Sequence, residues 1–206
     1  MAAKRDDTTI SASGLEHGSL HARRRKLNQD KADQRRAELA KLIEAKLKAP
    51  EKDAVLGFAD KFYTATQADD LCDRPAEQLF GAVMTAWRHL AKRAPGEALI
   101  DLINPRMAEH GWSCAHTVVS IVTDDMPFLV ASITNALVAE GIQLHLVVHP
   151  VVETKRNDAG VRDDAGRPVC EAVIHIEIDE QPEGEALDRL TAQLKGVLKD
   201  IRASVE

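Results

Sequence analysis

The chain has few aromatic residues, few cysteines and no long apolar stretch. Aromatic side chains make up 3% of the 206 residues, too few for the stacking platforms on which single-stranded nucleic acids bind. The three cysteines are an odd number without CxxC spacing, so neither a disulfide framework nor a zinc knuckle is indicated. No apolar run approaches the roughly twenty residues of a membrane helix, and no signal peptide opens the chain. We therefore expect a cytoplasmic protein without a membrane partner.

Signatures of catalysis and cofactor binding are also absent from the sequence. It contains no GxGxxG dinucleotide turn, no nucleophile elbow and no phosphate loop. Asp124 and Asp125 could be read as an acid and base pair, but adjacent side chains diverge, and capping with the helix dipole explains aspartate at a helix start. We expect no catalytic residue and no cofactor site in this chain.

Charge is unevenly distributed. The net charge is −6, yet residues 1–50 carry 12 Lys and Arg against 7 Asp and Glu. The basic run Arg23-Arg24-Arg25-Lys26 would suit a phosphate backbone. Without accompanying aromatic residues, a solvated basic helix face is the simpler interpretation. No nucleic-acid partner is expected.

The first half of the chain predicts helices. Residues 1–18 are small and polar, typical of a disordered tail. Residues 19–95 form a predicted helical lead-in, in which an apolar stripe around Leu39 and Ile43 ends before Pro50, and two further helices follow at Asp53–Ala65 and Pro75–Lys92. Pro95-Gly96 closes this region.

Residues 96–206 predict a small α+β domain. A β-branched strand covers Val118–Val122, and a helix is expected to begin near Asp125, with Pro127 in its first turn, and to end at Gly141. Two alternating runs, from Ile142 and from Val169, predict an antiparallel hairpin around a loop rich in Asp and Gly. A last amphipathic helix runs from about Leu187 to Arg202.

The predicted order βαββα is that of a ferredoxin-like plait with an antiparallel sheet. Both helices should cover the sheet face of Ile174, Ile176 and Ile178, while the opposite face, with His175 and Glu177, stays open. No fourth strand follows the last helix, and the upstream run Leu99–Asn104 is a candidate for the vacant edge.

The open face suggests one metal hypothesis. If the hairpin register sets His145 beside His175, with His149 beside Glu171 and Gln143 beside Glu177, two imidazoles and a carboxylate could bind zinc. A solvated or partner-covered polar face is the simpler interpretation, so His145 and His175 are weak candidates and no metal is expected.

Two families are suggested by short motifs. The run DMPFLV, followed by EGI, resembles the D-x-P-G-L-L and later G-I signature of ACT domains, small modules that often bind amino acids and regulate metabolic enzymes. More narrowly, VTDDMPFLV with HLVVHPVV and HIEID resembles the start of the large bacterial NAD-specific glutamate dehydrogenases. The upstream FYTATQADDLCDRPAEQLFGAVMTAWRHL and NPRMAEHGWSCAHTVV are similar to the region before the first ACT-like module of those enzymes.

The resemblance implies an ACT-like fold and an effector site at Asp124, Asp125, Met126 and Phe128. Phe128 stands where the ACT pattern has glycine, which places a side chain in the space where ligands approach the backbone. This departure favours a purely architectural role over amino-acid binding.

The resemblance also implies a parent enzyme that converts L-glutamate, NAD and water to 2-oxoglutarate, ammonia and NADH. Its NAD site and catalytic lysine and aspartate would lie downstream of Glu206. The implied role of this chain is a non-catalytic regulatory or interaction segment within a homo-oligomer, with other domains or subunits as partners and an amino acid as a candidate effector. The alternative is a free-standing ACT-like module that binds a small molecule or a metal.

Overall fold

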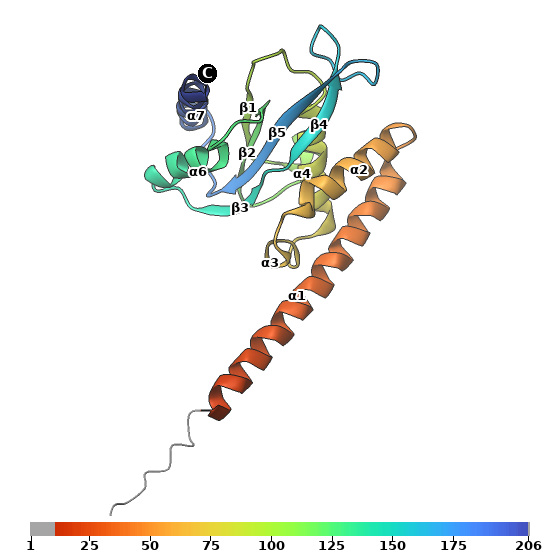
Figure 1. The fold of residues 1–206 in the computed structure, drawn as a ribbon, viewed down its shortest axis with the longest axis vertical. Helices are drawn as coiled ribbons and strands as arrows, with labels where there is room; N and C mark the ends of the chain where they lie inside the picture. Colours follow the sequence, from red (N-terminus) through yellow and green to blue (C-terminus); the bar gives the residue numbers. More distant parts are fainter. Residues whose placement is uncertain (1–10, 206) are drawn as a thin grey trace, which may run out of the picture.

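The computed structural model describes residues 11–205, with side chains described from Leu20 onward. A long helix, α1 (Ser11–Lys46), projects from the rest of the molecule (Figure 1). The predicted tail lies outside the described residues over positions 1–10, whereas positions 11–18 belong to α1. Helix α1 thus begins earlier than the predicted start of the lead-in.

Three further helices complete the lead-in: α2 (Glu51–Thr64), the short α3 (Ala68–Leu71) and α4 (Ala76–His89). Proline residues stand before two of them. Pro50 precedes α2, and Pro75 precedes α4 in an extended conformation that a helix interior does not allow. The predicted second and third helices agree with α2 and α4 to within three residues.

The second half forms an antiparallel sheet of five strands: β1 (Leu99–Ile103), β2 (Thr117–Asp124), β3 (Leu144–Val148), β4 (Val151–Arg156) and β5 (Arg167–Ile178). The order is β1-β2-β5-β3, and β4 also pairs with β5. The remaining helices are the short α5 (Met107–His110), α6 (Leu129–Ala139) and α7 (Glu185–Val205). The predicted α+β, ACT-like plait is confirmed, and β1 occupies the edge beside β2 that the sequence left vacant.

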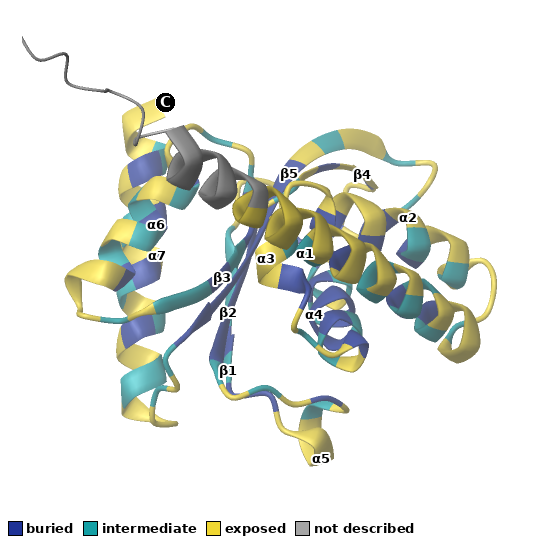
Figure 2. Cartoon of the chain, turned by 90° about the horizontal axis from the view of Figure 1, so that it is seen from below, coloured by how far each residue is buried: buried dark blue, intermediate teal, exposed yellow. Residues whose placement is uncertain are grey.

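Helices cover both faces of the sheet (Figure 2). On one face Ile174 and Ile176 pack with Ile133 of α6 and Leu194 of α7. On the other face Val118, Val122 and Val173 pack in one core with the lead-in helices, including the α4 residues Leu79 and Val83. The prediction that this second face stays open was wrong, because its alternating pattern mixes polar residues with enough apolar ones to bury α4.

The predicted hairpin register was also wrong. Val148 lies opposite His175, and Leu146 lies opposite Glu177, while an irregularity between Leu144 and Leu146 takes His145 out of the ladder. Glu171 pairs with Val152 rather than His149. A bulge displaces every later pair along the strand, and its position is not encoded in the alternation of side chains.

Candidate effector loop and the buried ion-pair clusters

The loop between β2 and α6 carries the residues predicted to bind an effector. The helix starts at Leu129, four residues after the predicted start at Asp125, because Phe128 has a left-handed backbone with φ 68° that cannot continue into a helix. The loop borders a hollow of about 290 Å³. Asp125, Met126 and Phe128 line it from the loop, together with residues of α6, the exposed His149 and Val151 near the β3–β4 turn, and Ala172 and Ile174 of β5.

Phe128 is the most unusual residue of this loop. It is the one non-glycine residue with positive φ among the described residues, and its side chain is 73% exposed. A left-handed conformation costs an L-amino acid about 1–2 kcal/mol, which explains why the ACT pattern has glycine at this position. The neighbouring Val151 is 52% exposed, so the hollow has an apolar rim.

Asp124, the fourth predicted residue, does not line the hollow. Its Oδ1 accepts a hydrogen bond of 2.7 Å from Arg93, and its Oδ2 accepts one of 2.8 Å from Arg202 on α7. Burial alone would raise the pKa of Asp124, but the hydrogen bonds from Arg202 and Arg93 outweigh it and hold the pKa below its usual value. This carboxylate binds two arginines of its own chain.

Arg93 also binds Glu171, a carboxylate with 0% exposure on β5. Its Nε donates to Glu171 Oε1 at 2.5 Å. Arg156 of β4 donates to the same carboxylate through Nε at 3.0 Å and Nη2 at 2.8 Å, and the Thr154 hydroxyl donates to it as well. Two guanidinium groups and a hydroxyl thus surround one buried carboxylate, as buried charges require. The sequence analysis did not predict this cluster. A glutamate within an apolar strand, such as Glu171, is a signal that a buried cation pairs with it.

The histidines proposed as metal ligands lie in a different arrangement. His145 Nε2 lies 2.7 Å from Asp179 Oδ1, and its ring stacks on His116 with centroids 4.1 Å apart. His175 is buried, and its ring meets Phe62 of α2 edge-on at 5.9 Å. In the part of the chain that the structure describes, no group of three or more His, Cys, Asp or Glu residues could hold a metal ion. The structure does not bring His145 and His175 together as a metal site.

Glu177 anchors this histidine region to the lead-in. Arg74, between α3 and α4, donates from Nη1 to Glu177 Oε2 at 2.5 Å, and His116 Nδ1 lies 3.1 Å from the same oxygen. Burial favours a raised pKa, but the neighbouring His175 and Arg74 outweigh it and lower the pKa of Glu177 to about 2. The carboxylate is therefore ionised over the physiological pH range.

A serine, a histidine and an aspartate also meet beside α4. Ser120 Oγ lies 3.0 Å from His89 Nδ1, and His89 Nε2 lies 3.5 Å from Asp101 Oδ2. A nucleophilic serine must be reachable by a substrate, whereas Ser120 is only 1% exposed in the middle of β2. The trio connects α4 to β1 and β2, and the Ser120 hydroxyl is buried away from any external substrate.

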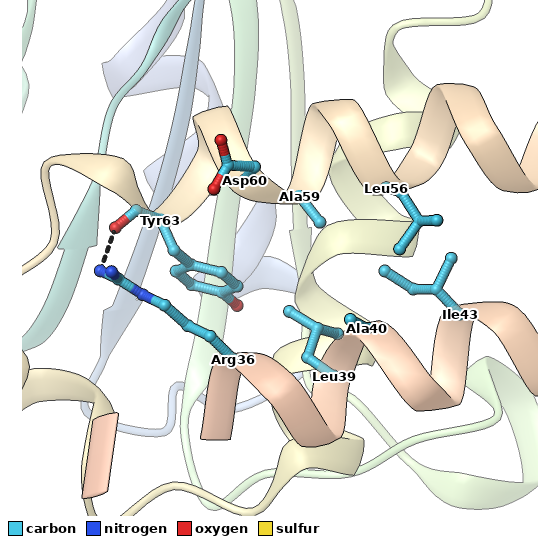
Figure 3. Close-up of a pocket in the computed structure, with 8 residues that line it drawn as sticks. All are labelled: Arg36, Leu39, Ala40, Ile43, Leu56, Ala59, Asp60 and Tyr63. Atoms are coloured by element: carbon cyan, nitrogen blue, oxygen red, sulfur yellow. Dashed lines mark hydrogen bonds between the residues drawn. The ribbon is translucent and has the colours of Figure 1, made fainter. Parts of the chain in front are cut away.

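A smaller hollow of about 100 Å³ lies between α1 and α2. Figure 3 shows it lined by Leu39, Ile43 and Leu56, with Arg36 reaching across to the backbone carbonyl of Tyr63 at 2.8 Å. The Tyr63 hydroxyl donates to the Leu79 carbonyl at 3.1 Å, and burial raises the pKa of this phenol. The volume holds only about three waters, so this hollow is a small packing gap between α1 and α2.

Residues 58–194 match the family described as glutamate dehydrogenase, ACT1 domain. The chain belongs to this family. The matched region begins within α2, includes α4 and the sheet, and ends within the first half of α7, so the family unit contains lead-in helices as well as the plait.

Two curated relatives are both named NAD-specific glutamate dehydrogenase. The protein of Halomonas elongata is 30% identical over 175 residues, which cover 82% of this chain and 11% of the relative. The protein of Pseudomonas aeruginosa is 28% identical over 155 residues, which cover 72% of this chain and 10% of the relative. The chain thus spans about a tenth of the length of the relatives it matches. No solved structure matches the chain.

None of the helices in the described residues combines the length and apolar character needed to cross a bilayer. The predicted cytoplasmic location remains a prediction.

Proposed function

We propose that this chain is the non-catalytic N-terminal regulatory and interaction segment of an NAD-dependent glutamate dehydrogenase. Membership in the ACT1 family and the names of the relatives support this parentage. The parent would oxidise L-glutamate to 2-oxoglutarate and ammonia, with its NAD site elsewhere in the polypeptide. The segment would act on that reaction through contacts with other domains or subunits of a homo-oligomer.

The exposed rim of the effector hollow is the observation that carries this proposal. Phe128 retains a strained backbone and an exposed aromatic ring next to the exposed Val151. Neither feature stabilises the isolated chain, because exposed apolar surface gains nothing and the left-handed backbone costs free energy. Both are accounted for if the rim docks on another domain of the parent, where aromatic side chains contribute strongly to an interface.

An amino-acid effector is the second candidate function. It is supported by the hollow of about 290 Å³ and by Asp125 and His149, polar residues that line it. Against it stands Asp124, whose carboxylate is held by Arg93 and Arg202 rather than turned to the hollow. The architectural role is therefore the better supported of the two.

Replacing Phe128 by glycine tests the docking role. In the isolated chain the relief of the left-handed strain, about 1–2 kcal/mol, exceeds the added freedom of glycine in the unfolded chain, about 0.4–1 kcal/mol. We expect the variant chain to be more stable in urea unfolding by on the order of 0.5–1 kcal/mol. In the purified parent enzyme the same change should instead lower the thermal unfolding temperature, because a domain contact is lost.

Phe128→Leu is the matched control, since it retains a β-carbon in the left-handed conformation and should not stabilise the isolated chain. A Phe128→Gly change that stabilises chain and parent alike would contradict docking.

Calorimetry with a panel of amino acids tests the effector role. Saturable heat with the wild-type chain supports the second candidate, and heat that appears only in Phe128→Gly shows that the phenyl ring blocks the site. The parentage is tested separately by an assay of NAD reduction. The parent enzyme should reduce NAD with L-glutamate, and the 206-residue chain alone should not.

A further inference from the structure

Helix α6 carries no charged side chain, although one side of it is exposed to solvent. All of its exposed side chains are uncharged, namely Ala131, Asn135, Val138 and Ala139. The neighbouring helix α7 covers the same face of the sheet (Figure 2), and its exposed side chains include Asp188, Lys195 and Lys199. The outer side of α7 is therefore typical of a solvated helix, whereas that of α6 is typical of a surface that another element covers.

The uncharged side chains of α6 form a stripe that continues the rim of Phe128. Ala131, Asn135 and Val138 follow one another at steps of four and three, which places them on one face of the helix. Ala131 lines the same hollow as Phe128, so the α6 stripe begins at that rim. Val138, at its far end, is 57% exposed. The ten positions from Phe128 to Val138 extend over about 15 Å, enough for one crossing helix.

The last turn of α7 lies beside the start of α6. Arg202 Nη2 lies 2.8 Å from Asp124 Oδ2, and Asp124 precedes Phe128 by four positions. At the opposite ends of the two helices, Gln193 Nε2 donates to Glu140 Oε1 at 3.2 Å. The helices are therefore antiparallel, and polypeptide that continues past α7 starts at the Phe128 end of the α6 stripe.

We propose that the α6 stripe binds the segment that directly follows residue 206 in the parent enzyme, through an apolar helix of that segment. This inference rests on the proposed function, under which the polypeptide continues, and it identifies the partner of the docking surface. The matched regions make up only 11% and 10% of the two relatives, so a parent of similar length has ample polypeptide for such a segment.

Proximity and charge both favour this partner. A segment joined by a short linker has an effective concentration of about 1 mM, which gives it an advantage over a separate subunit. An apolar helix suits the α6 stripe, because a charged group buried against uncharged side chains would have no partner. The small side chain of Ala131, between the larger Phe128 and Val138, leaves a groove into which a ridge of the partner helix can pack.

Site-specific photo-crosslinking in the purified parent enzyme tests the proposal. Ala139 is exposed beside the α6 stripe and is replaced by the photoreactive amino acid p-benzoylphenylalanine. At an effective concentration of about 1 mM, a contact with a Kd of roughly 0.1 mM is occupied in about nine of ten molecules. We therefore expect cross-linked peptides, within a single polypeptide, from the roughly one hundred residues after position 206. The same probe in place of Asp188, on the outer side of α7, should give no such peptide.

A charge placed on the stripe tests whether the stripe makes the contact. Asn135→Lys should lower the yield of this cross-link at least about tenfold, because the ammonium group would be buried without a partner in the docked state. Ala192→Lys, at an exposed position of α7, is the matched control and should leave the yield unchanged. Both positions are exposed, so in the isolated chain both variants should unfold within about 2 °C of the wild type.

The possible contrary results separate this inference from the proposed function. Cross-links to a second subunit, or to a distant part of the parent, would overturn the inference and leave the docking role in place. The absence of any cross-link would overturn the inference alone if Phe128→Gly still lowers the unfolding temperature of the parent, and would overturn the docking role as well if it does not. An unchanged yield in Asn135→Lys would show that the α6 stripe does not make the contact.

Discussion

At the scale of single residues, Glu171 joins the parts of the molecule that lie far apart in the sequence. Its buried carboxylate binds Arg93, which follows the last lead-in helix, and Arg156 on the neighbouring strand. Arg93 then extends the contact to Asp124, and Asp124 extends it to Arg202 on α7. The sequence analysis placed Glu171 on the sheet face considered for a metal site. In the structure its carboxylate instead holds the lead-in, the sheet and the last helix together.

Removing the charge of Glu171 should be strongly destabilising. In Glu171→Gln the guanidinium groups of Arg93 and Arg156 remain buried without their carboxylate, and the expected loss is about 3–5 kcal/mol in the free energy of unfolding. Urea unfolding followed by circular dichroism measures it. Glu153→Gln on the exposed side of β4 is the control and should stay within about 0.5 kcal/mol of the wild type. If Glu171→Gln also stayed within about 0.5 kcal/mol of the wild type, the cluster would contribute little to stability.

Glu177 should make stability depend on pH in the acid range. Its pKa is lowered from 4.5 to about 2 in the folded chain, so its contribution is fully present above about pH 4.5 and is lost as the pH falls towards 2. The contribution is on the order of 3 kcal/mol. Between pH 6 and pH 3 the free energy of unfolding should fall less steeply in Glu177→Gln than in the wild type, because the variant has no carboxyl group at this position to take up a proton.

Glu180→Gln, a change on the exposed segment after β5, provides the reference for this experiment and should follow the wild-type pH profile. Parallel profiles for the wild type and Glu177→Gln would mean that Arg74 and His175 do not hold the carboxylate ionised in the native state.

At the scale of elements, α4 is the helix that closes the second face of the sheet. It packs closely because Gly81 has no side chain: a β-carbon there would lie 2.2 Å from ring atoms of Trp112, in the segment before β2. Glycine is unfavourable inside a helix by about 1 kcal/mol, so its presence in α4 reflects this close approach. By contrast, a β-carbon on Gly57 of α2 would meet nothing within 4 Å.

These two glycines form a matched pair for mutation. Gly81→Ala should destabilise the chain by about 1–3 kcal/mol, because overpacking against Trp112 exceeds the gain in helix propensity. Gly57→Ala should stabilise it by up to about 1 kcal/mol. Urea unfolding of both variants measures the signs, and a stabilising Gly81→Ala would mean that α4 and Trp112 are not packed together.

At the scale of the whole molecule, the lead-in and the plait share a core. The predicted boundary at residues 95 and 96 divides an apolar cluster in which the lead-in residues Leu79 and Val83 pack with Val122 and Val173 of the sheet. Because helices cover both faces of the sheet, the exposed surfaces of the described residues include the rim of Phe128 and Val151 and the side chains of Leu20–Leu27 on the projecting part of α1 (Figures 1 and 2).

Removal of residues 1–95 should therefore abolish cooperative folding. The truncated chain would expose the second sheet face, and we expect it to bind the dye ANS and to lose a sharp thermal transition. Removing residues 1–26 is the control, since the described side chains from Leu20 to Lys26 are exposed, and the transition should survive. A cooperative transition in the chain that starts at residue 96 would show that the plait is an independent domain.

The sequence by itself determined the longer helices, the strands β2, β3 and β5 and the ACT-like fold, because periodicity along the chain depends on neighbouring residues. The strand β4 and the short helices α3 and α5 were not predicted. Thus Ile174 and Ile176 were assigned to the same face from their spacing, and α2 and α4 from their apolar stripes. The resemblance of the DMPFLV loop added the family, which residues 58–194 match.

Only the tertiary structure decided which surfaces are covered, the register of the hairpin and the partners of the acidic residues. Arg93 and Glu171 are separated by 78 positions, and no local pattern joins them. The position of the bulge beside His145 is likewise not specified by the alternation of side chains. For the left-handed backbone of Phe128, by contrast, the glycine of the ACT pattern at this position was a signal in the sequence. Local spacing specifies which face of an element is apolar, whereas the surface that covers that face depends on how the whole chain folds.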